Sequence, residues 1–416
     1  MPTSASRLLL LLPTTTYRTE AFVAAATRMG VELVCASERP STLQEHAPDN
    51  LVTLDFNDAS ASAEAIAWLA RRRPIDAVVA VDDLTTVVAA AISARLGLKT
   101  NSLPAVTTAR DKHAMRRCLA DASVPVPRFR LVDLSHDPRA IAEQVKYPCV
   151  LKPRMLSASR GVIRANDARE FVAAFGRIAA ILAEVEASLP DKARRTLLVE
   201  AFVPGREVAL EGLLVGGTLH VLALFDKPDP LDGPFFEETI YVTPSRLPGA
   251  TQARIAAVSR DACAALGLTE GPIHAELRVN EQGPWVLEVA ARSIGGLCSQ
   301  TLRFGTGLSL EELILCHALG RPLDSLEREQ RAAGVMMIPI PRAGRLRAVT
   351  GRDEATAVDG IEEVAVTMHP GQTVVPLPEG WQYLGFIFAR ADTPVAVERA
   401  LREAHARLRF DIEQAE

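Results

Sequence analysis

Short apolar segments alternate with amphipathic segments through the first hundred residues, and this alternation limits the possible folds more than any other feature of the sequence. Short apolar segments of this kind are typical of buried strands, and strands separated by helices form parallel sheets covered on both faces. We therefore predict an N-terminal Rossmann-like layer. Its strands are expected at residues 8–12, 31–36 and 77–81, and its helices at 19–29, 61–72 and 85–96.

The remainder of the chain is predicted to mix strands and helices. A helix is expected at 111–121 because Asp111 is a suitable N-cap, and the Val-Pro-Val-Pro sequence at 124–127 would end it. Two hairpins are expected, one around Gly216 and Gly217 and one over 274–289. Further strands are expected at 149–152, 197–202, 334–339, 345–349, 361–366 and 383–391, and further helices at 168–187, 251–266, 308–319 and 394–408.

Together these elements indicate a fold that combines the α/β and α+β classes. The β-rich end of the chain is expected to be a separate unit that covers a site or builds a homodimer. The predicted units are a Rossmann-like domain at 1–110, a small subdomain with a linker helix at 111–205, a large subdomain at 206–322 and a C-terminal β-rich unit at 323–416.

Composition and charge exclude several classes of protein. The chain has 416 residues and a net charge of −5, so it lacks the basic excess that nucleic-acid binding usually needs. The five leucines at 8–12 are too few for a signal peptide, and no segment reaches the about 18 apolar residues of a membrane helix. We expect a cytoplasmic protein that binds small molecules and has neither nucleic-acid nor membrane partners.

Five charged residues follow one another through the middle of the chain: Lys112, Lys152, Glu276, Glu288 and Arg292. Lysines act as point charges for phosphates, and paired carboxylates suit a divalent cation. No P-loop motif occurs in the sequence. The pattern therefore predicts a nucleoside-triphosphate site in which side chains and a different glycine loop hold the phosphates.

The predicted phosphate side of this site combines a strand and a loop. Lys152 ends a predicted strand, which would aim its ammonium, although an edge lysine in solvent is the plain alternative. The loop that follows carries Ser157, Ser159 and Gly161, whose hydroxyl and backbone N–H groups could cover the β- and γ-phosphates.

An adenine slot is predicted where another strand ends. Glu200 could accept a hydrogen bond from the adenine amino group, the backbone of Phe202 and Val203 could contact the ring edge, and Glu207 could bind the ribose hydroxyls. The alternative is a strand followed by a tight turn with solvated acidic side chains.

The predicted metal ligands lie on the second hairpin. Glu276 and Glu288 occupy opposed strands, so their carboxylates would repel each other and raise each other's pKa. A divalent cation removes that cost, and oxygen ligands beside phosphates favour Mg²⁺. Two surface glutamates on an exposed hairpin are the alternative. Arg292 has the planar fork that suits a phosphoryl group or a developing oxyanion.

In their order and spacing these motifs resemble the ATP-grasp superfamily over residues 5–320. The Glu-Xaa-Xaa-Xaa-Arg-Xaa-Xaa-Gly-Gly sequence at 288–296 and the β-rich end resemble L-amino acid ligases, which form dipeptides. The motifs that carry the likeness are Asp-Lys at 111–112, Val-Pro-Val-Pro at 124–127, Val-Leu-Lys-Pro at 150–153, Ser-Ala-Ser-Arg-Gly-Val at 157–162, Val-Glu-Ala-Phe-Val-Pro-Gly-Arg-Glu at 199–207, Ile-His-Ala-Glu-Leu at 273–277 and Leu-Glu-Val-Ala-Ala-Arg-Ser-Ile-Gly-Gly at 287–296.

The resemblance implies a role for each matching residue. Lys112 and Lys152 would bind the phosphates of ATP, and Arg292 would stabilise an acyl-phosphate and the tetrahedral intermediate. Glu276 and Glu288 would hold Mg²⁺, which Mn²⁺ could replace. Glu200 with Phe202 and Val203 would bind adenine, and Glu207 would bind ribose. Many ATP-grasp enzymes have a metal-binding asparagine where this chain has Ala290, which leaves the number of metal ions open.

The implied reaction joins a carboxylate to an amine through an acyl-phosphate, with release of ADP and phosphate. The loops at 155–162 and 229–239 are candidate lids against water. His274 and Arg292 are expected to bind a substrate carboxyl group, and Glu237 or Glu238 an α-amino group. Ser293, Gly295 and Gly296 would border the acyl side chain, with room beside Gly296.

Three other interpretations stay open at this point. The first is another ATP-grasp ligase, of the biotin carboxylase-like or nucleotide-precursor kind. The second is a nucleotide-binding protein without turnover, with Ala290 as the lost ligand. The third is a nicotinamide-dependent oxidoreductase, which the absence of a Gly-Xaa-Gly-Xaa-Xaa-Gly motif argues against.

Overall fold

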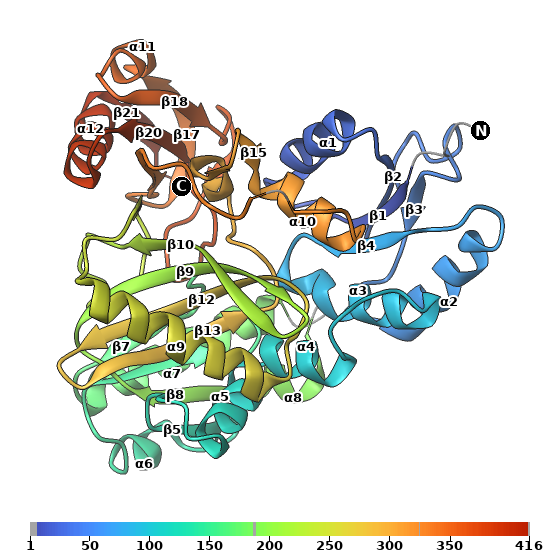
Figure 1. Ribbon diagram of the computed structural model, residues 1–416. Coiled ribbons are helices and arrows are strands. Elements are labelled where there is room, and N and C mark those ends of the chain that lie inside the picture. Colours follow the sequence, from blue (N-terminus) through green and yellow to red (C-terminus); the bar gives the residue numbers. More distant parts are fainter. Residues whose placement is uncertain (1–5, 186–188, 324, 415–416) are drawn as a thin grey trace.

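The computed structural model describes residues 6–185, 189–323 and 325–414 (Figure 1). Its N-terminal part is a parallel sheet with strand order β3-β2-β1-β4, as the alternating pattern predicted. Strand β3 was not predicted because it has only three residues. The strands are β1 (Arg7–Leu11), β2 (Glu32–Ser37), β3 (Leu51–Thr53) and β4 (Ala77–Ala80), and the helices are α1 (Thr19–Arg28), α2 (Ala59–Ala70) and α3 (Asp83–Leu96).

The leucines of β1 are buried on both faces of this sheet. Leu8 and Leu10 belong to a core shared with α1 and with α10 (Leu310–Ala318), whereas Leu9 and Leu11 pack into the core under α2 and α3. Alternate residues of a strand point to opposite faces, so an unbroken run of leucines suits a sheet covered on both sides.

A four-stranded antiparallel sheet with order β5-β8-β6-β7 forms the second layer. Helix α7 (Ala168–Glu184) packs on it through Phe171, Phe175, Ile178 and Leu182, which recur at helical spacing. Residues 186–187, which the sequence also assigned to this helix, lie outside the described residues. The strands are β5 (Phe129–Asp133), β6 (Cys149–Pro153), β7 (Ile163–Ala165) and β8 (Thr196–Ala201).

The largest sheet has eight strands in the order β13-β12-β9-β10-β11-β16-β20-β18. Both predicted hairpins are confirmed, and helix α9 (Gly249–Leu266) crosses the face of this sheet (Figure 1). The strands are β9 (Arg206–Val215), β10 (Thr218–Asp226), β11 (Ile240–Thr243), β12 (Gly271–Asn280), β13 (Gly283–Ala290), β16 (Ala332–Ile338), β18 (Ile361–Val366) and β20 (Gly385–Ala391).

Three of the C-terminal strands join the sheet of the two hairpins instead of forming a layer of their own. Strand β11 pairs with β16 from Ile240 to Thr243, so β16, β20 and β18 continue the sheet of the two hairpins. The sequence could not show this pairing, because β11 is short and follows an irregular loop. The division of the chain into four units stays a prediction.

The remaining elements are short or connect the layers. Helix α12 (Pro394–Arg407) covers β16 and β20, and a small sheet with order β19-β17-β21 completes the C-terminal part. The other elements are α4 (Leu103–Arg110), α5 (Lys112–Asp121), α6 (Pro138–Ala142), α8 (Asp191–Arg194), α11 (Arg352–Thr356), the 3-10 helix η2 (Cys298–Thr301), β14 (Arg303–Phe304), β15 (Leu308–Ser309), β17 (Gly344–Thr350), β19 (Thr373–Val374) and β21 (Arg409–Glu413).

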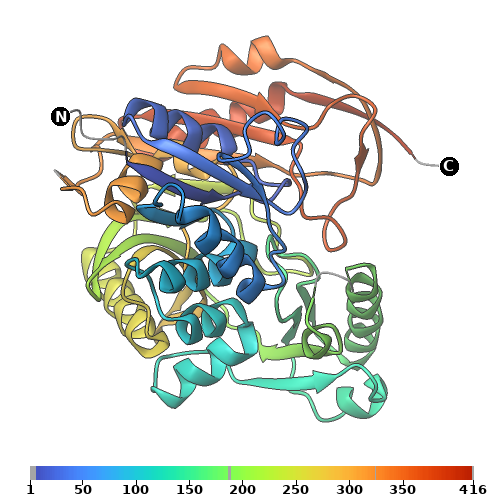
Figure 2. The same cartoon turned by 90° about the vertical axis from the view of Figure 1, so that its right-hand side faces the viewer.

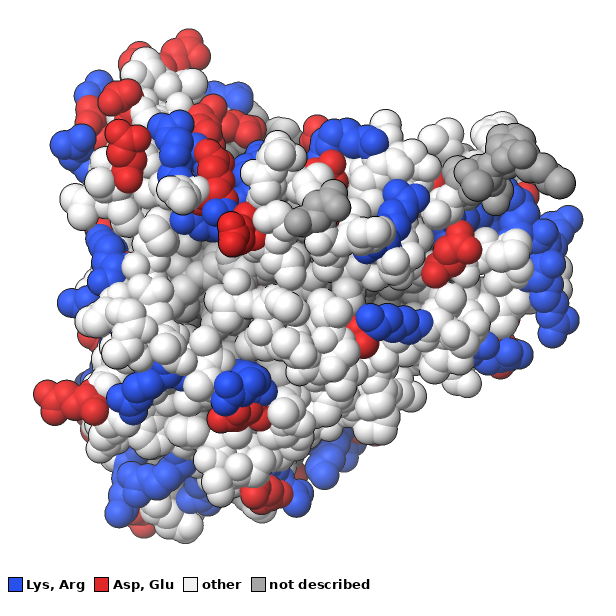
Figure 3. Space-filling view, viewed as in Figure 1, with Lys and Arg blue, Asp and Glu red and all other residues white. Residues whose placement is uncertain are grey.

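The distribution of charged side chains on the surface agrees with the small net charge of the chain. Basic and acidic side chains are interspersed over the face shown in Figure 3. Within the described part of the chain, no helix combines the length and apolar character needed to cross a bilayer.

Candidate active site

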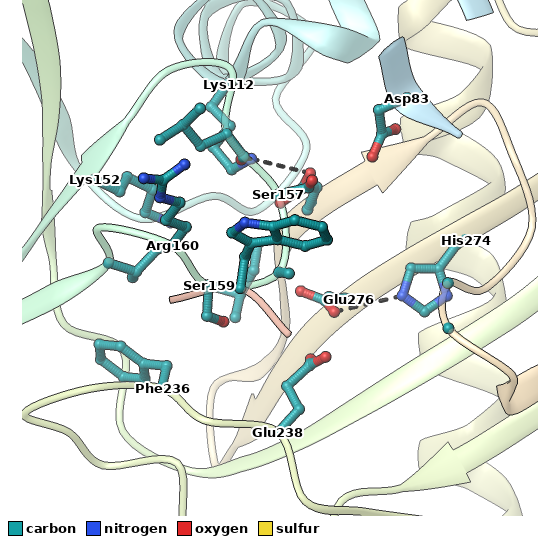
Figure 4. Close-up of a pocket in the computed structure, with 18 of the residues that line it drawn as sticks. Asp83, Lys112, Lys152, Ser157, Ser159, Arg160, Phe236, Glu238, His274 and Glu276 are labelled. Carbon is teal, nitrogen blue, oxygen red and sulfur yellow. Dashed lines mark hydrogen bonds and ion pairs between the residues drawn. The ribbon is translucent and has the colours of Figure 1, made fainter. Parts of the chain in front are cut away.

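A cavity of about 450 Å³ lies where the three large sheets meet. Asp83 of α3, Lys112 of α5, Lys152 of β6 and Glu276 of β12 all face it, so every major layer contributes a charged side chain (Figure 4). The predicted site residues that line it are Lys112, Lys152, Ser157, Ser159, Glu200, Phe202, Val203, Glu207, Glu238, His274, Glu276, Glu288, Arg292, Gly295 and Gly296.

Lys112 lies at the start of α5, where the side chain of Asp111 caps the helix by accepting from the N–H groups of His113 and Ala114. Its ammonium donates to the carbonyl of Leu156, 2.8 Å away, and to Oε1 of Glu288 at 3.1 Å. The buried lysine thus joins the loop at 155–162, here called the serine loop, to the second hairpin.

Lys152 and Arg116 both bind Glu200. The lysine Nζ is 2.6 Å from Oε2 and the arginine Nε is 2.5 Å from Oε1. Burial opposes the ionisation of Glu200, but the two cations outweigh it and hold its pKa at about 2. Because both carboxylate oxygens already contact cations, Glu200 orients Lys152 here, and its contact with adenine stays a prediction. Arg116 was missed because the helical pattern favoured apolar inward residues.

Lys227 follows β10 and contacts three carboxylates. Its Nζ is 2.9 Å from Oε1 of Glu207 and 3.1 Å from Oε1 of Glu276, and it also donates to Glu238. Burial disfavours the ammonium, but these carboxylates raise the pKa of Lys227 well above its usual value. The sequence offered one signal for this lysine, an Asp-Lys-Pro turn directly after a predicted strand.

Burial and the nearby charge of Glu276 raise the pKa of Glu238 to about 7, although Lys227 opposes the shift. The hydroxyl of Tyr241 also donates to Glu238, at 2.8 Å. Glu238 is therefore an acid–base group near neutrality that faces the cavity. Burial also raises the pKa of the neighbouring Glu237.

His274 of β12 lies between Glu211 of β9 and Glu276 of its own strand. Its Nδ1 is bonded to Glu211, and its Nε2 lies 3.4 Å from Oε1 of Glu276. Burial works against the charged imidazole, but Glu211 outweighs it and raises the pKa of His274 to about 9. The ring is therefore a cation at neutral pH, which suits the predicted contact with a substrate carboxyl group.

The two predicted metal ligands lie directly opposite each other, since Glu276 pairs with Glu288 across β12 and β13. Residues directly opposite in an antiparallel pair point to the same face, so both carboxylates face the cavity. Their oxygens are ligands that Mg²⁺ prefers, and the carboxylates of Glu207, Glu238 and Glu276 converge within 4.8 Å of one another. Glu276, with Glu207 and Glu238, therefore belongs to a donor set that fits a divalent cation, whereas Glu288 is not part of this convergent group.

Arg292 is held by the N-terminal layer. Its Nη2 lies 2.8 Å from Oδ2 of Asp83, at the start of α3. Burial opposes the charge of Arg292, but Asp83 and then Asp82 raise its pKa. Asp82 and Asp83 were missed, because the sequence assigned no site to this layer.

The structure differs from two predicted contacts and from one predicted space. Ser293 lies outside the cavity lining, and its buried hydroxyl accepts from Arg18 at 2.6 Å. Gly296 leaves no spare room, because a Cβ there would lie 3.0 Å from the ring of Phe386, whereas a Cβ at Gly295 would meet no atom within 4 Å. Gly161 also lies outside the lining. Its N–H donates to the carbonyl of Pro378.

The serine loop covers one side of the cavity. Ser157, Ser159 and Arg160 face Glu276 and Glu238 across it (Figure 4). Ala158 and Ser159 have φ angles of 53° and 54°, a left-handed conformation that costs free energy for residues with a side chain. Strain of this kind is common at ligand-binding loops, which agrees with the predicted contact with phosphates.

Three parts of the chain match models of known protein families. Residues 145–301 match the model of an ATP-grasp domain, residues 23–100 that of an ATP-grasp N-terminal domain, and residues 336–413 that of an L-amino acid ligase C-terminal domain. The crystal structure of an L-amino acid ligase from Bacillus licheniformis is similar to the whole chain. The TM-score is 0.81 at 25% identity, covering 99% of this chain and 100% of that one.

Two curated relatives of known activity are similar over a smaller part of this chain. Alanine–anticapsin ligase of Bacillus subtilis is 26% identical over 61% of this chain and 56% of its own length. Dapdiamide A synthase of Enterobacter agglomerans is 26% identical over 71% of this chain and 70% of its own. The chain spans less than two thirds of the length of the first relatives, 59% of one and 56% of another.

Proposed function

From the premise that the chain has the ATP-grasp fold and is an L-amino acid ligase-like protein, we propose that it is an ATP-dependent carboxylate–amine ligase that joins amino acids into a dipeptide or a related amide. The observation that carries the proposal is the pair Glu276 and Glu288, which lie opposite each other between Lys112 and Lys227 in a cavity that Arg292 also lines.

Nucleotide binding is assigned to the basic side of the cavity. Lys112, Lys152 and Lys227 neutralise the phosphates, since each ammonium faces the cavity or lies against its acidic lining. The backbone of Phe202 and Val203 borders the adenine ring. Glu207, already oriented by Arg278 at 3.1 Å, accepts from the ribose hydroxyls.

Mg²⁺ is assigned to Glu276 and Glu288, where it would neutralise phosphate charge and fix the phosphate geometry. The remaining catalysis is assigned to the chain's own groups. A substrate carboxylate attacks the γ-phosphorus, and ADP leaves. Arg292 holds the oxygens of the resulting acyl-phosphate, because Asp83 fixes its guanidinium in the cavity.

Amide formation requires a neutral amine. We assign proton removal to Glu238, whose pKa of about 7 suits a general base near neutral pH. The amine then attacks the carbonyl carbon, and phosphate leaves from the tetrahedral intermediate. The carboxyl group of one substrate is expected to contact the charged His274, and its side chain the open space beside Gly295.

The test is a screen of amino acid pairs with Mg-ATP. Release of ADP and phosphate that requires two amino acids, together with a product mass equal to their sum minus water, is expected. ADP release that requires bicarbonate would favour a carboxylase-like ligase instead. Absence of ADP formation with every pair would favour a nucleotide-binding protein without turnover.

A further inference from the structure

A segment of the C-terminal part of the chain reaches the cavity. Residues 376–381, here called the strap, lie between β19 and β20, and Trp381 at their end lines the cavity. In Figure 2 an orange-red loop hangs from the C-terminal sheet towards the green helix α7. The strap is a tight turn, because the N–H of Gly380 donates to the carbonyl of Pro376 at 2.9 Å.

The strap is fastened to the phosphate side of the cavity at two points. The N–H of Gly161, in the serine loop, donates to the carbonyl of Pro378 at 2.9 Å. Arg177 of α7 binds Glu379 through two hydrogen bonds, one of them 2.8 Å from Nη2 to Oε2. A planar guanidinium with two parallel bonds to one carboxylate fixes direction as well as distance.

Arg177 also contacts the second loop beside the cavity. Its guanidinium lies 4.9 Å from the ring centre of Phe235, and Phe235 forms a backbone bridge with Ile163. Arg177 therefore contacts both the loop at 229–239 and the strap, and the serine loop contacts the strap through Gly161.

We propose that the strap is the third lid of the active site, that Trp381 limits the size of the bound side chain and excludes water from the acyl-phosphate, and that the Arg177–Glu379 pair is the latch that holds the strap closed. This inference rests on the proposed ligase function for its chemistry, but the latch itself can be measured without any reaction.

The chemistry requires such a lid. Water that reaches an acyl-phosphate attacks it and yields the free carboxylate and phosphate, so that ATP is consumed without an amide. The indole of Trp381 is large and rigid, and it lies half-buried in the lining. The latch is solvent-accessible, with side-chain exposures of 44% for Arg177 and 32% for Glu379. A pair this exposed is weak enough to open and close with substrate exchange.

The first measurement follows the strap directly. The chain has three tryptophans, Trp68, Trp285 and Trp381, so a protein with Trp68→Phe and Trp285→Phe reports on Trp381 alone. In this background Glu379→Gln is expected to increase the acrylamide quenching constant of Trp381 by about 2- to 5-fold. This is the increase in the population of the open strap that follows from the loss of one solvent-accessible ion pair. The exchanged pair Arg177→Glu with Glu379→Arg should restore the original value.

The matched control is Glu403→Gln, which removes another exposed ion pair of the C-terminal part, between Arg407 and Glu403 at 2.9 Å. This control should leave the quenching of Trp381 unchanged. An unchanged quenching constant in Glu379→Gln, or the same increase in Glu403→Gln, would overturn the latch.

The second measurement tests the chemistry in the wild-type background. The ratio of phosphate released to amide formed should be near one in the wild-type protein and rise several-fold in Glu379→Gln and in Trp381→Ala, but not in Glu403→Gln. Trp381→Ala should also accept larger amino acids, and Trp381→Phe should do so less. Amide formation with an unchanged ratio would overturn the lid. Absence of amide in the wild-type protein would instead reject the proposed function, and the quenching result would still decide the latch.

Discussion

Glu276 and Glu288 lie directly opposite each other on β12 and β13, and each carboxylate accepts a hydrogen bond from a different lysine, Lys227 for Glu276 and Lys112 for Glu288. The cavity is therefore close to charge balance before a nucleotide binds. We infer that binding is an exchange of partners, in which phosphates take the lysines and a divalent cation takes the glutamates. Such an exchange avoids leaving a buried charge unpaired.

Glu288→Gln is expected to lower Mg-ATP turnover by about 100-fold or more, because it removes a negative ligand and the partner of Lys112. The measurement is ADP release with a productive amino acid pair, alongside circular dichroism to show that the fold is kept. Glu281→Gln, on the exposed turn of the same hairpin, should keep wild-type activity. Full activity in Glu288→Gln would remove it from the metal site.

Lys227→Met should destabilise the protein by about 3–5 kcal/mol, because three carboxylates that line the cavity lose their shared buried cation. Urea unfolding measures this loss in the free energy of unfolding. Added Mg²⁺ or Mn²⁺ should raise the melting temperature of this variant more than that of the wild type, since the vacated carboxylate oxygens converge. The control Lys146→Met alters an exposed lysine and should show neither effect. Equal metal responses in all three proteins would count against the exchange of partners.

Stability should fall above neutral pH because of His274. Its pKa is about 9 in the folded protein and about 6.5 in the unfolded chain, so its contribution is complete below pH 6.5 and is lost as the pH rises through 9. Between pH 7.5 and 9.5 the loss is on the order of 2 kcal/mol. Urea unfolding should show this loss in the wild type and in the exposed-site control His46→Gln, but not in His274→Gln. Parallel curves for all three would contradict the charged state of His274.

Two neighbouring glycines should respond differently to alanine. Gly296→Ala is expected to cost about 1–3 kcal/mol, because its φ of +58° is left-handed and its Cβ would press on Phe386. Gly295→Ala should change stability by less than about 0.5 kcal/mol. Its methyl group would enter the cavity, and the KM for an amino acid should rise while the KM for ATP stays unchanged. Melting curves and substrate titrations on the pair separate the two roles.

The sequence predicted the elements whose pattern is local. The parallel N-terminal sheet and both hairpins follow from periodicity and turn residues, and the second hairpin brings Glu276 opposite Glu288 as expected. What it missed depends on contacts between distant segments. Lys227 and Asp83 belong to the site only because the sheets pack together. Arg116 is buried because it binds Glu200, and this partner is 84 residues away in the sequence. The expected contact of Ser293 with the acyl side chain was wrong for the same reason, since its hydroxyl accepts from Arg18, 275 residues away in the sequence.

The eight-stranded sheet has a mechanical consequence. An unbroken set of hydrogen-bonded ladders runs from β13 to β18, so the hairpin that carries Glu276 and Glu288 and strand β20, which follows the strap, behave as one stiff body. The four-stranded sheet with α7 is a second body, joined to the first through the turn between β8 and β9 and the segment around residues 122–128. If the second body rotates about those two connections, it moves away from the eight-stranded sheet. The Arg177–Glu379 ion pair is then the contact that breaks when the two bodies separate.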